Sequence, residues 1–212
     1  MKYDLVIWDF NGTIIDDVAL GISSVNTMLA KRSLPVLESA NEYRAKLRFP
    51  IIDYYRSLGF DFGAEPYDVL AREWVELYNA GEDKCAACTG ADDAVRRIRE
   101  AGIEQQILSA SERGMLIASL RRLGLEGYFG EIYAQDNFYA EGKLGTAKAI
   151  ASRFGERRAV MLGDTVHDFE TARIIGADCI LFTGGHGMYS DLAACRVPLV
   201  SDLREAADII LG

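Results

Sequence analysis

Short apolar runs alternate with amphipathic stretches over most of the chain, and the two patterns predict different elements. Residues 3–8 are apolar and partly β-branched and end at turn-forming residues, which predicts a buried strand. We predict further strands at 103–108, 131–134, 159–162 and 179–182, and helices at 91–101, 115–123, 146–154 (with Thr146 as N-cap) and 168–175. This alternation indicates an α/β fold in which helices cover both faces of a parallel sheet.

The stretch that follows the first predicted strand has a different period. Apolar residues recur there at helical spacing, over 18–29 and again over 69–78. We therefore expect residues 16–84 to form a helical cap, inserted into a core built from residues 1–15 and 85–212. Ligands of parallel sheets bind beyond the carboxyl ends of the strands, so this cap should cover the ligand edge.

Composition and charge limit the classes of function. The chain has 212 residues, with 23 Lys and Arg against 32 Asp and Glu, which gives a formal net charge of -9. Because acidic surfaces repel nucleic acid and anionic membranes, we expect neither as a partner. The N-terminus lacks a basic segment followed by an apolar run, and no stretch approaches the roughly 18 apolar residues of a membrane span. We expect a cytoplasmic protein that is a monomer by default.

The four cysteines are Cys85, Cys88, Cys179 and Cys195. They are too few and too unevenly spaced for a disulfide framework, so we expect reduced thiols. Cys85 and Cys88 have the spacing of a redox pair or of half a metal site, but no second pair or histidine follows at ligand spacing. We expect these two to be packing residues near the hinge of the cap.

Three aspartates follow predicted strands and should meet at the ligand edge of the sheet. Asp9 comes directly after the first strand, and Asp164 and Asp168 follow the strand at 159–162. Carboxylates brought together in this way repel one another unless a cation neutralises them. Because the candidate ligands are all oxygens, with no histidine or cysteine required, Mg²⁺ suits the site better than zinc.

Groups suited to a phosphate lie beside these aspartates in the predicted fold. Gly12 and Thr13 offer backbone N–H groups in a turn, and Ser109, which ends the strand at 103–108, offers a hydroxyl. Lys143 could supply a fixed positive charge, with Lys148 as a rival on a solvent-exposed helix face. Asp9, at the strand end, is placed to be a nucleophile that forms an aspartyl-phosphate.

Four segments in order resemble the motifs of the haloacid dehalogenase superfamily. The first is Asp9-Phe-Asn-Gly-Thr, the second ends at Ser109, the third is Gly142-Lys143, and the fourth is Gly163-Asp164-Thr-Val-His-Asp168. The resemblance covers nearly the whole chain. It implies a modified Rossmann-like core with a helical cap, as in members that resemble phosphoglycolate phosphatases.

The resemblance also implies roles for the motif residues. Mg²⁺ would be held by Asp9, the main-chain carbonyl of Asn11 and Asp164, with Asp168 in support. Ser109 with Ala110, Gly12 with Thr13, and Lys143 would bind the transferred phosphoryl group. The expected activity is hydrolysis of a small phosphorylated metabolite through an aspartyl-phosphate on Asp9.

Asn11 departs from the motif of the phosphatases in this superfamily, which have at this position an aspartate that protonates the leaving alkoxide. A carboxamide cannot transfer that proton, and general acid–base catalysis contributes about 10² to 10⁴-fold. We therefore expect a preference for aryl and acyl phosphates, whose leaving groups need little protonation, and a slowly hydrolysed phosphoenzyme. Asn11→Asp should raise the rate on alkyl phosphates.

The sequence also allows other classes of function. Asn11 also suits a catalytically impaired protein that binds a phosphate compound or a partner without useful turnover. Dehalogenase members do not need Mg²⁺, and the retained Asp164 and Asp168 argue against that branch. Phosphonatase members use a lysine of the cap, and Lys46 is the lysine of this chain that lies nearest to the comparable stretch.

Two further groups of residues have open roles. Arg44, Lys46 and Arg48 could meet an anionic substrate tail, although a solvated helix face is the commoner role of such a cluster. His186 could touch the cap or the substrate, or lie in an exposed loop. His167 is interpreted as a loop residue rather than a metal ligand.

Overall fold

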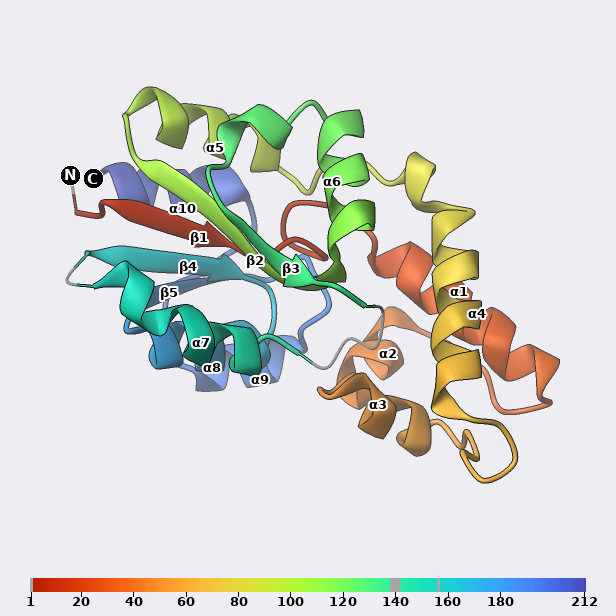
Figure 1. The fold of residues 1–212 in the computed structure, drawn as a ribbon. Helices are drawn as coiled ribbons and strands as arrows, with labels where there is room; N and C mark the ends of the chain where they lie inside the picture. The colour runs from red at the N-terminus through yellow and green to blue at the C-terminus, as the bar shows by residue number, and fades with distance from the viewer. Residues whose placement is uncertain (1, 138–141, 156) are drawn as a thin grey trace.

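The sheet has six parallel strands in the order β3-β2-β1-β4-β5-β6, within the described residues 2–137, 142–155 and 157–212 of this computed structural model (Figure 1). The central strand β1 pairs with β2 on one side and β4 on the other, and all four of its residues are buried. Apolar runs of this kind are typical of parallel strands covered on both faces. The strands are β1 Leu5–Trp8, β2 Glu104–Glu112, β3 Ile132–Gln135, β4 Ala159–Gly163, β5 Asp178–Phe182 and β6 Leu199–Val200.

Helices cover both faces of this sheet, each over its own apolar cluster (Figure 1). On α5 the residues Ala91, Ala94, Val95 and Ile98 form a buried stripe at helical spacing, which packs with α10 on the sheet. One face carries α5 Ala91–Glu100, α6 Arg113–Arg122 and α10 Leu203–Leu211, and the other α7 Leu144–Phe154, α8 Val166–Ile175 and α9 Tyr189–Ala194.

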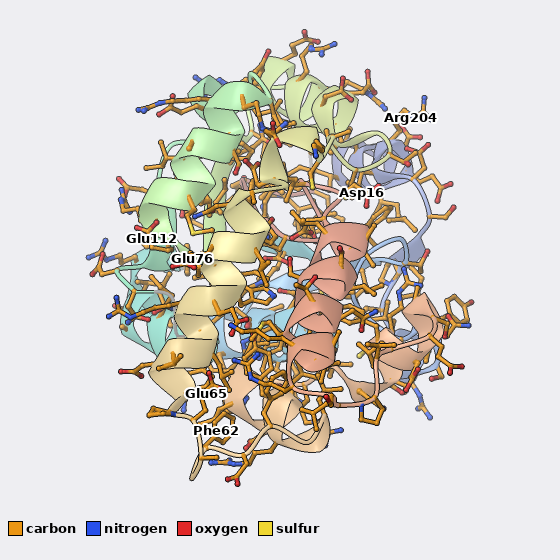
Figure 2. The ribbon with its side chains drawn as sticks, turned by 90° about the vertical axis from the view of Figure 1, so that its right-hand side faces the viewer. Asp16, Phe62, Glu65, Glu76, Glu112 and Arg204 are labelled. Carbon is orange, nitrogen blue, oxygen red and sulfur yellow. The ribbon has the colours of Figure 1, made fainter. Side chains whose placement is uncertain are left out.

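A separate helical unit lies beyond the carboxyl ends of the strands, on the side away from both termini (Figure 1). It has its own apolar cluster, rich in aromatic rings, and it is fastened by Arg32, whose guanidinium binds Glu65 and Glu73. Figure 2 looks onto this unit, with α1 and α4 towards the viewer. The helices of the helical unit are α1 Val18–Lys31, α2 Ala40–Lys46, α3 Ile51–Ser57 and α4 Tyr67–Asn79.

The α/β architecture predicted from the sequence is confirmed, with corrections to several elements. Strand β2 runs to Glu112 rather than ending at residue 108, because a register shift against β3 carries it past Ser109. Helix α7 begins at Leu144 with Lys143 as N-cap residue, so the expectation that Thr146 caps this helix is wrong. The sequence analysis did not predict α9, β6 or α10. The elements α9 and β6 are short, whereas the buried residues of α10 do recur at helical spacing, at positions 203, 206, 207 and 210.

The predicted division into a core and a cap at residues 16–84 stays a prediction, although the helical unit occupies most of that span. The short 3-10 helices η1 Glu82–Lys84 and η2 Glu126–Tyr128 lie outside the expected elements. Residues 1, 138–141 and 156 of the predicted core lie outside the described residues. No helix in the described part of the chain combines the length and apolarity that a membrane crossing requires.

Candidate active site

Three aspartates meet at the carboxyl edge of the sheet, as the strand ends predict. Asp9 follows β1, Asp164 follows β4, and Asp168 lies in the first turn of α8. One carboxylate oxygen of each lies within 4.8 Å of the others, and all three residues are buried. Asp168 is fixed by accepting hydrogen bonds from the backbone N–H of Asp164 and of Thr165 at 3.1 and 2.9 Å.

Lys143 reaches into this cluster from the N-terminal end of α7. Its Nζ lies 2.5 Å from Asp9 Oδ1 and also binds Asp168 Oδ1, and the residue is only 4% exposed. The backbone N–H of Lys143 donates to Nε2 of His167 at 2.7 Å, which holds the lysine in place. Lys148, the rival cation, is exposed on α7. The structure therefore places Lys143, and not Lys148, beside the carboxylates.

When all three carboxylates are ionised, the negative charge of this cluster exceeds its positive charge. Three buried carboxylates face one ammonium. Burial raises the pKa of Asp9 well above its usual range, and burial with the neighbouring Asp168 raises the pKa of Asp164 to about 7. Lys143 outweighs burial at Asp168 and holds the pKa of that carboxyl below its usual value. An all-oxygen donor set with excess negative charge fits Mg²⁺ better than it fits zinc.

Two glycines allow loops to approach Asp164 closely. Gly12 has a positive φ of 72°, and a Cβ there would lie 2.3 Å from Asp164 Oδ2. A Cβ on Gly185 would lie 2.1 Å from the same oxygen and 2.4 Å from the carbonyl oxygen of Gly12. Asp164 accepts hydrogen bonds from the N–H of His186 at 2.6 Å and the hydroxyl of Thr13 at 3.3 Å. The backbone of these loops thus fixes the carboxylate.

We expect Gly185→Ala to lower the free energy of unfolding by about 1–3 kcal/mol, because the new methyl group would displace either Asp164 or the Gly12 carbonyl. Gly145→Ala in α7 is the matched control, since its Cβ would meet nothing within 4 Å. Urea unfolding followed by circular dichroism would measure both. Equal unfolding midpoints for the two variants would show that the Gly185 loop can move without cost.

Asn11 is held by three hydrogen bonds and lies at the mouth of the cluster. Its Nδ2 donates to Asp17 Oδ2 at 2.7 Å and to the Tyr78 hydroxyl at 3.0 Å, while its Oδ1 accepts from the Ser111 hydroxyl. A carboxylate could not donate the first of these bonds. The side-chain amide of Asn11 therefore complements the hydrogen-bonding groups around it, above all the acceptor Asp17.

Asp17 is a buried acceptor that the sequence pattern did not single out. Besides Asn11, it accepts hydrogen bonds from the N–H of Gly12 at 2.8 Å and the hydroxyl of Tyr78 at 2.9 Å, and lies 3.0 Å from His186 Nε2. Burial opposes ionisation of Asp17, but His186 and the other donors hold its pKa below the usual value. Asp17 in turn raises the pKa of His186 against the effect of burial.

His186 joins the sheet edge to the helical unit. Its Nδ1 lies 2.9 Å from the hydroxyl of Tyr43 on α2, and the neighbouring Arg44 donates from Nε to the carbonyl oxygen of Gly185 at 2.8 Å. Only 12% of the His186 side chain is exposed, so it is not a free loop residue. His186 therefore contacts the helical unit, and it also lines the cavity described next.

A cavity of about 170 Å³ lies between the sheet edge and the helical unit. Six predicted site residues line it, from four segments of the core. They are Asp9, Asn11, Ser109, Ala110, Lys143 and Asp164. Gly12, Thr13 and Asp168 are buried just behind these residues and hold them in place. The sequence-predicted site thus forms one cluster beside one cavity.

The model of the haloacid dehalogenase-like hydrolase family matches residues 6–182. The chain belongs to this family. A phosphoglycolate phosphatase of Caulobacter vibrioides is 25% identical over 189 residues, which cover 85% of this chain and 79% of that protein. Among solved structures, a haloacid dehalogenase-like hydrolase of Streptococcus pneumoniae has a TM-score of 0.81 at 17% identity, and a predicted phosphoglycolate phosphatase of Haemophilus somnus one of 0.80 at 14%. Each of these two alignments covers 99% of both chains.

These similarities show a phosphatase-type hydrolase with the α/β fold of the haloacid dehalogenase-like family. The sequence motifs found Asp9, Lys143 and Asp164 because each follows an apolar strand or stands in a recognisable motif. They gave no signal for Ser111 or Tyr78, which reach Asn11 from distant parts of the chain.

The remaining candidate residues lie outside the cavity or pack in the core. Lys46 forms an ion pair with Glu42 at 2.8 Å, and Arg48 is exposed to solvent; neither residue lines the cavity. Cys85 and Cys88 are buried free thiols in the core, and burial raises the pKa of Cys85 to about 11. A thiol that stays protonated in an apolar cluster is suited to packing rather than to redox chemistry.

Proposed function

We propose that this protein is a Mg²⁺-dependent phosphohydrolase that acts on a small phosphorylated metabolite through an aspartyl-phosphate on Asp9. The observation that carries the proposal is the buried group of Asp9, Asp164, Asp168 and Lys143 beside the cavity. No nucleic acid, membrane or protein partner is part of the proposal. The relatives named phosphoglycolate phosphatase support the phosphate ester class rather than one metabolite.

Each step of the proposed phosphoryl transfer and hydrolysis is assigned to residues of this chain. A carboxylate oxygen of Asp9 attacks phosphorus, and the bond from phosphorus to the leaving oxygen breaks, with its electron pair going to that oxygen. Water then attacks phosphorus, releasing phosphate and restoring Asp9. Asp9, the Asn11 carbonyl and Asp164 would hold Mg²⁺, with Asp168 in support. When bound, the ion offsets the charge of the phosphoryl oxygens, a task that Lys143 shares.

Proton delivery to the leaving group is the weak step of this mechanism. Asn11 occupies the position from which an acid would act, and its Nδ2 protons are already donated to Asp17 and Tyr78. Leaving groups that depart as stable anions should therefore react fastest. We propose that the helical unit is a cap that excludes water from Asp9 while this occurs.

The second candidate function is phosphate binding without useful turnover, and the same locked carboxamide of Asn11 favours it. The phosphonatase alternative has less support, because Lys46 is ion-paired with Glu42 and stands outside the cavity wall. Turnover measurements separate the first two candidates.

The test of the proposed function uses acetyl phosphate and p-nitrophenyl phosphate with Mg²⁺. We expect turnover by the natural protein, and a mass increase of the intact protein by one phosphoryl group soon after mixing. Asp9→Asn should abolish both. Equal rates for the natural protein and Asp9→Asn would exclude the hydrolase, and phosphate binding without turnover would establish the second candidate.

Mg²⁺ should also stabilise the protein in the absence of substrate. Binding to the folded state alone at 100 times the dissociation constant adds about 2.7 kcal/mol to the free energy of unfolding. For a chain of this length the melting temperature should rise by about 5–10 °C. Asp164→Asn should lose this response, whereas Asp68→Asn, which changes an exposed aspartate of α4, should keep it. An unchanged melting temperature in the natural protein would remove the metal from the proposal.

A further inference from the structure

The cavity beside Asp9 has two chemically different ends. At the sheet edge it is walled by the aspartates and Lys143, and on the side of the helical unit by aromatic and aliphatic side chains. The rings of Trp74 and Tyr78 stack there with centroids 4.8 Å apart. Other aromatic residues of this wall are Tyr43, Phe49, Tyr54 and Tyr67. A phosphate ester bound to Asp9 would direct its organic part towards these rings.

The organic part of the substrate should not carry a second negative charge. Among the described residues that line the cavity, Lys143 is the one lysine or arginine, and it is bound to Asp9 and Asp168. Glu112 and Asp17 add acidic groups to the lining, and His186, which also lines the cavity, lies 3.0 Å from Asp17 through its Nε2. Arg44, Lys46 and Arg48 do not line the cavity. A carboxylate beside the phosphate would therefore find the cationic groups of the cavity already paired with acidic side chains of this chain, so its desolvation would be costly.

The size of the cavity limits the organic part of the substrate to a single ring at most. Its volume is about 170 Å³, which includes the end beside Asp9 where the phosphoryl group would lie. In another protein an engineered apolar cavity of about 150 Å³ is large enough to bind benzene. Aromatic rings gain more than area burial alone when they stack against other rings, as Trp74 and Tyr78 would allow.

The chemistry at Asn11 points to the same class of compound independently. A phenol has a pKa near that of tyrosine, about 10, whereas the pKa of an alkyl alcohol is closer to that of water, about 15.7. A phenolate therefore leaves without the proton that Asn11 cannot give. The wall of the cavity and the missing acid are separate features, and both favour an aryl ester.

We propose that the substrate is the phosphate monoester of a single-ring phenol. This inference rests on the proposed function. In the first step the bond between Asp9 and phosphorus forms while the bond from phosphorus to the phenolic oxygen breaks. The electron pair stays on the phenolate, which takes a proton from solvent after release. Hydrolysis of the aspartyl-phosphate completes the reaction.

A kinetic panel separates recognition of the ring from the quality of the leaving group. Phenyl and benzyl phosphate both carry a ring, but only phenyl phosphate has a phenolic leaving group, and propyl phosphate has neither. We expect KM for both ring compounds to be at least tenfold below that for propyl phosphate, and kcat to be highest for phenyl phosphate. Equal KM values for all three compounds would overturn the proposal.

Variants of the wall test the named rings. Trp74→Leu should reduce the preference for phenyl over propyl phosphate, in KM, by about tenfold. Phe62→Leu is the matched control, because Phe62 belongs to the same helical unit but lies outside the cavity wall, in the loop at the far end from Arg204 (Figure 2). An unchanged preference in Trp74→Leu would contradict the assignment of the wall.

Binding without turnover gives a second readout. Calorimetric titration of Asp9→Asn with phenylphosphonate should show tighter binding than titration with propylphosphonate. Failure of the proposed function would appear differently, as acetyl phosphate turnover that is absent or that survives in Asp9→Asn. If acetyl phosphate is hydrolysed through Asp9 and the ring gives no advantage in KM or in binding, the proposed function stands and this inference is wrong.

Discussion

We expect the paired substitution Asn11→Asp with Asp17→Asn to raise kcat on alkyl phosphates by about 10² to 10⁴-fold, the usual contribution of a general acid. The pair exchanges a carboxylate and a carboxamide whose atoms Nδ2 and Oδ2 lie 2.7 Å apart, so a hydrogen bond between the two positions is kept with its direction reversed. The acid is thereby introduced where the leaving oxygen should lie. Benzyl and propyl phosphate are the substrates to measure.

The single substitution Asn11→Asp should gain less than tenfold. Its new carboxyl would face the buried carboxylate of Asp17 at hydrogen-bond distance, and two such groups cannot both ionise. They would share one proton, which is then unavailable to the substrate. Asp17→Asn alone, which introduces no acid, is the control. Equal gains from the single and the paired substitution would show that Asp17 does not restrict position 11, and no gain from either would place the limiting step elsewhere.

This outcome differs from the expectation that the sequence alone supports. The motif alone predicts that Asn11→Asp restores the missing general acid. The structure adds Asp17, six residues along, whose carboxylate makes the amide of Asn11 a suitable partner. Such a dependence cannot be recognised from spacing, because it requires Tyr78 and His186 to converge on Asp17 from the helical unit and from a core loop.

The elements that the sequence predicted well share a physical reason. β1 and β4 are buried on both faces and therefore read as uninterrupted apolar runs, and α5 has a regular buried stripe. The polar residues that end those strands locate Asp9 and Asp164. In contrast, the apolar wall of the cavity comes from α1, α2, α3 and α4 together with α6, and its shape depends on how those helices pack. The reaction class could therefore be predicted from motifs, whereas the organic part of the substrate could not.

Removal of the charge on Lys143 should have the largest effect on stability. Lys143→Met keeps most of the aliphatic length but leaves Asp9 and Asp168 without their ammonium partner in a buried site. Breaking a buried ion pair from one side costs about 3–5 kcal/mol, because the remaining charge stays desolvated. At about 2–4 °C per kcal/mol, the melting temperature in the absence of Mg²⁺ should fall by roughly 6–20 °C.

Lys148→Met is the matched control for this experiment, since it removes an exposed lysine from the same helix, five residues along the chain. Its melting temperature should change by little, because exposed charges contribute about 0–1 kcal/mol. The responses to Mg²⁺ then distinguish two origins of the effect. If the deficit of Lys143→Met arises from unbalanced carboxylates, Mg²⁺ should stabilise this variant more than the natural protein, as a cation among Asp9, Asp164 and Asp168 would replace the missing charge. A deficit of the same size with and without Mg²⁺ would instead assign it to lost packing of the lysine side chain.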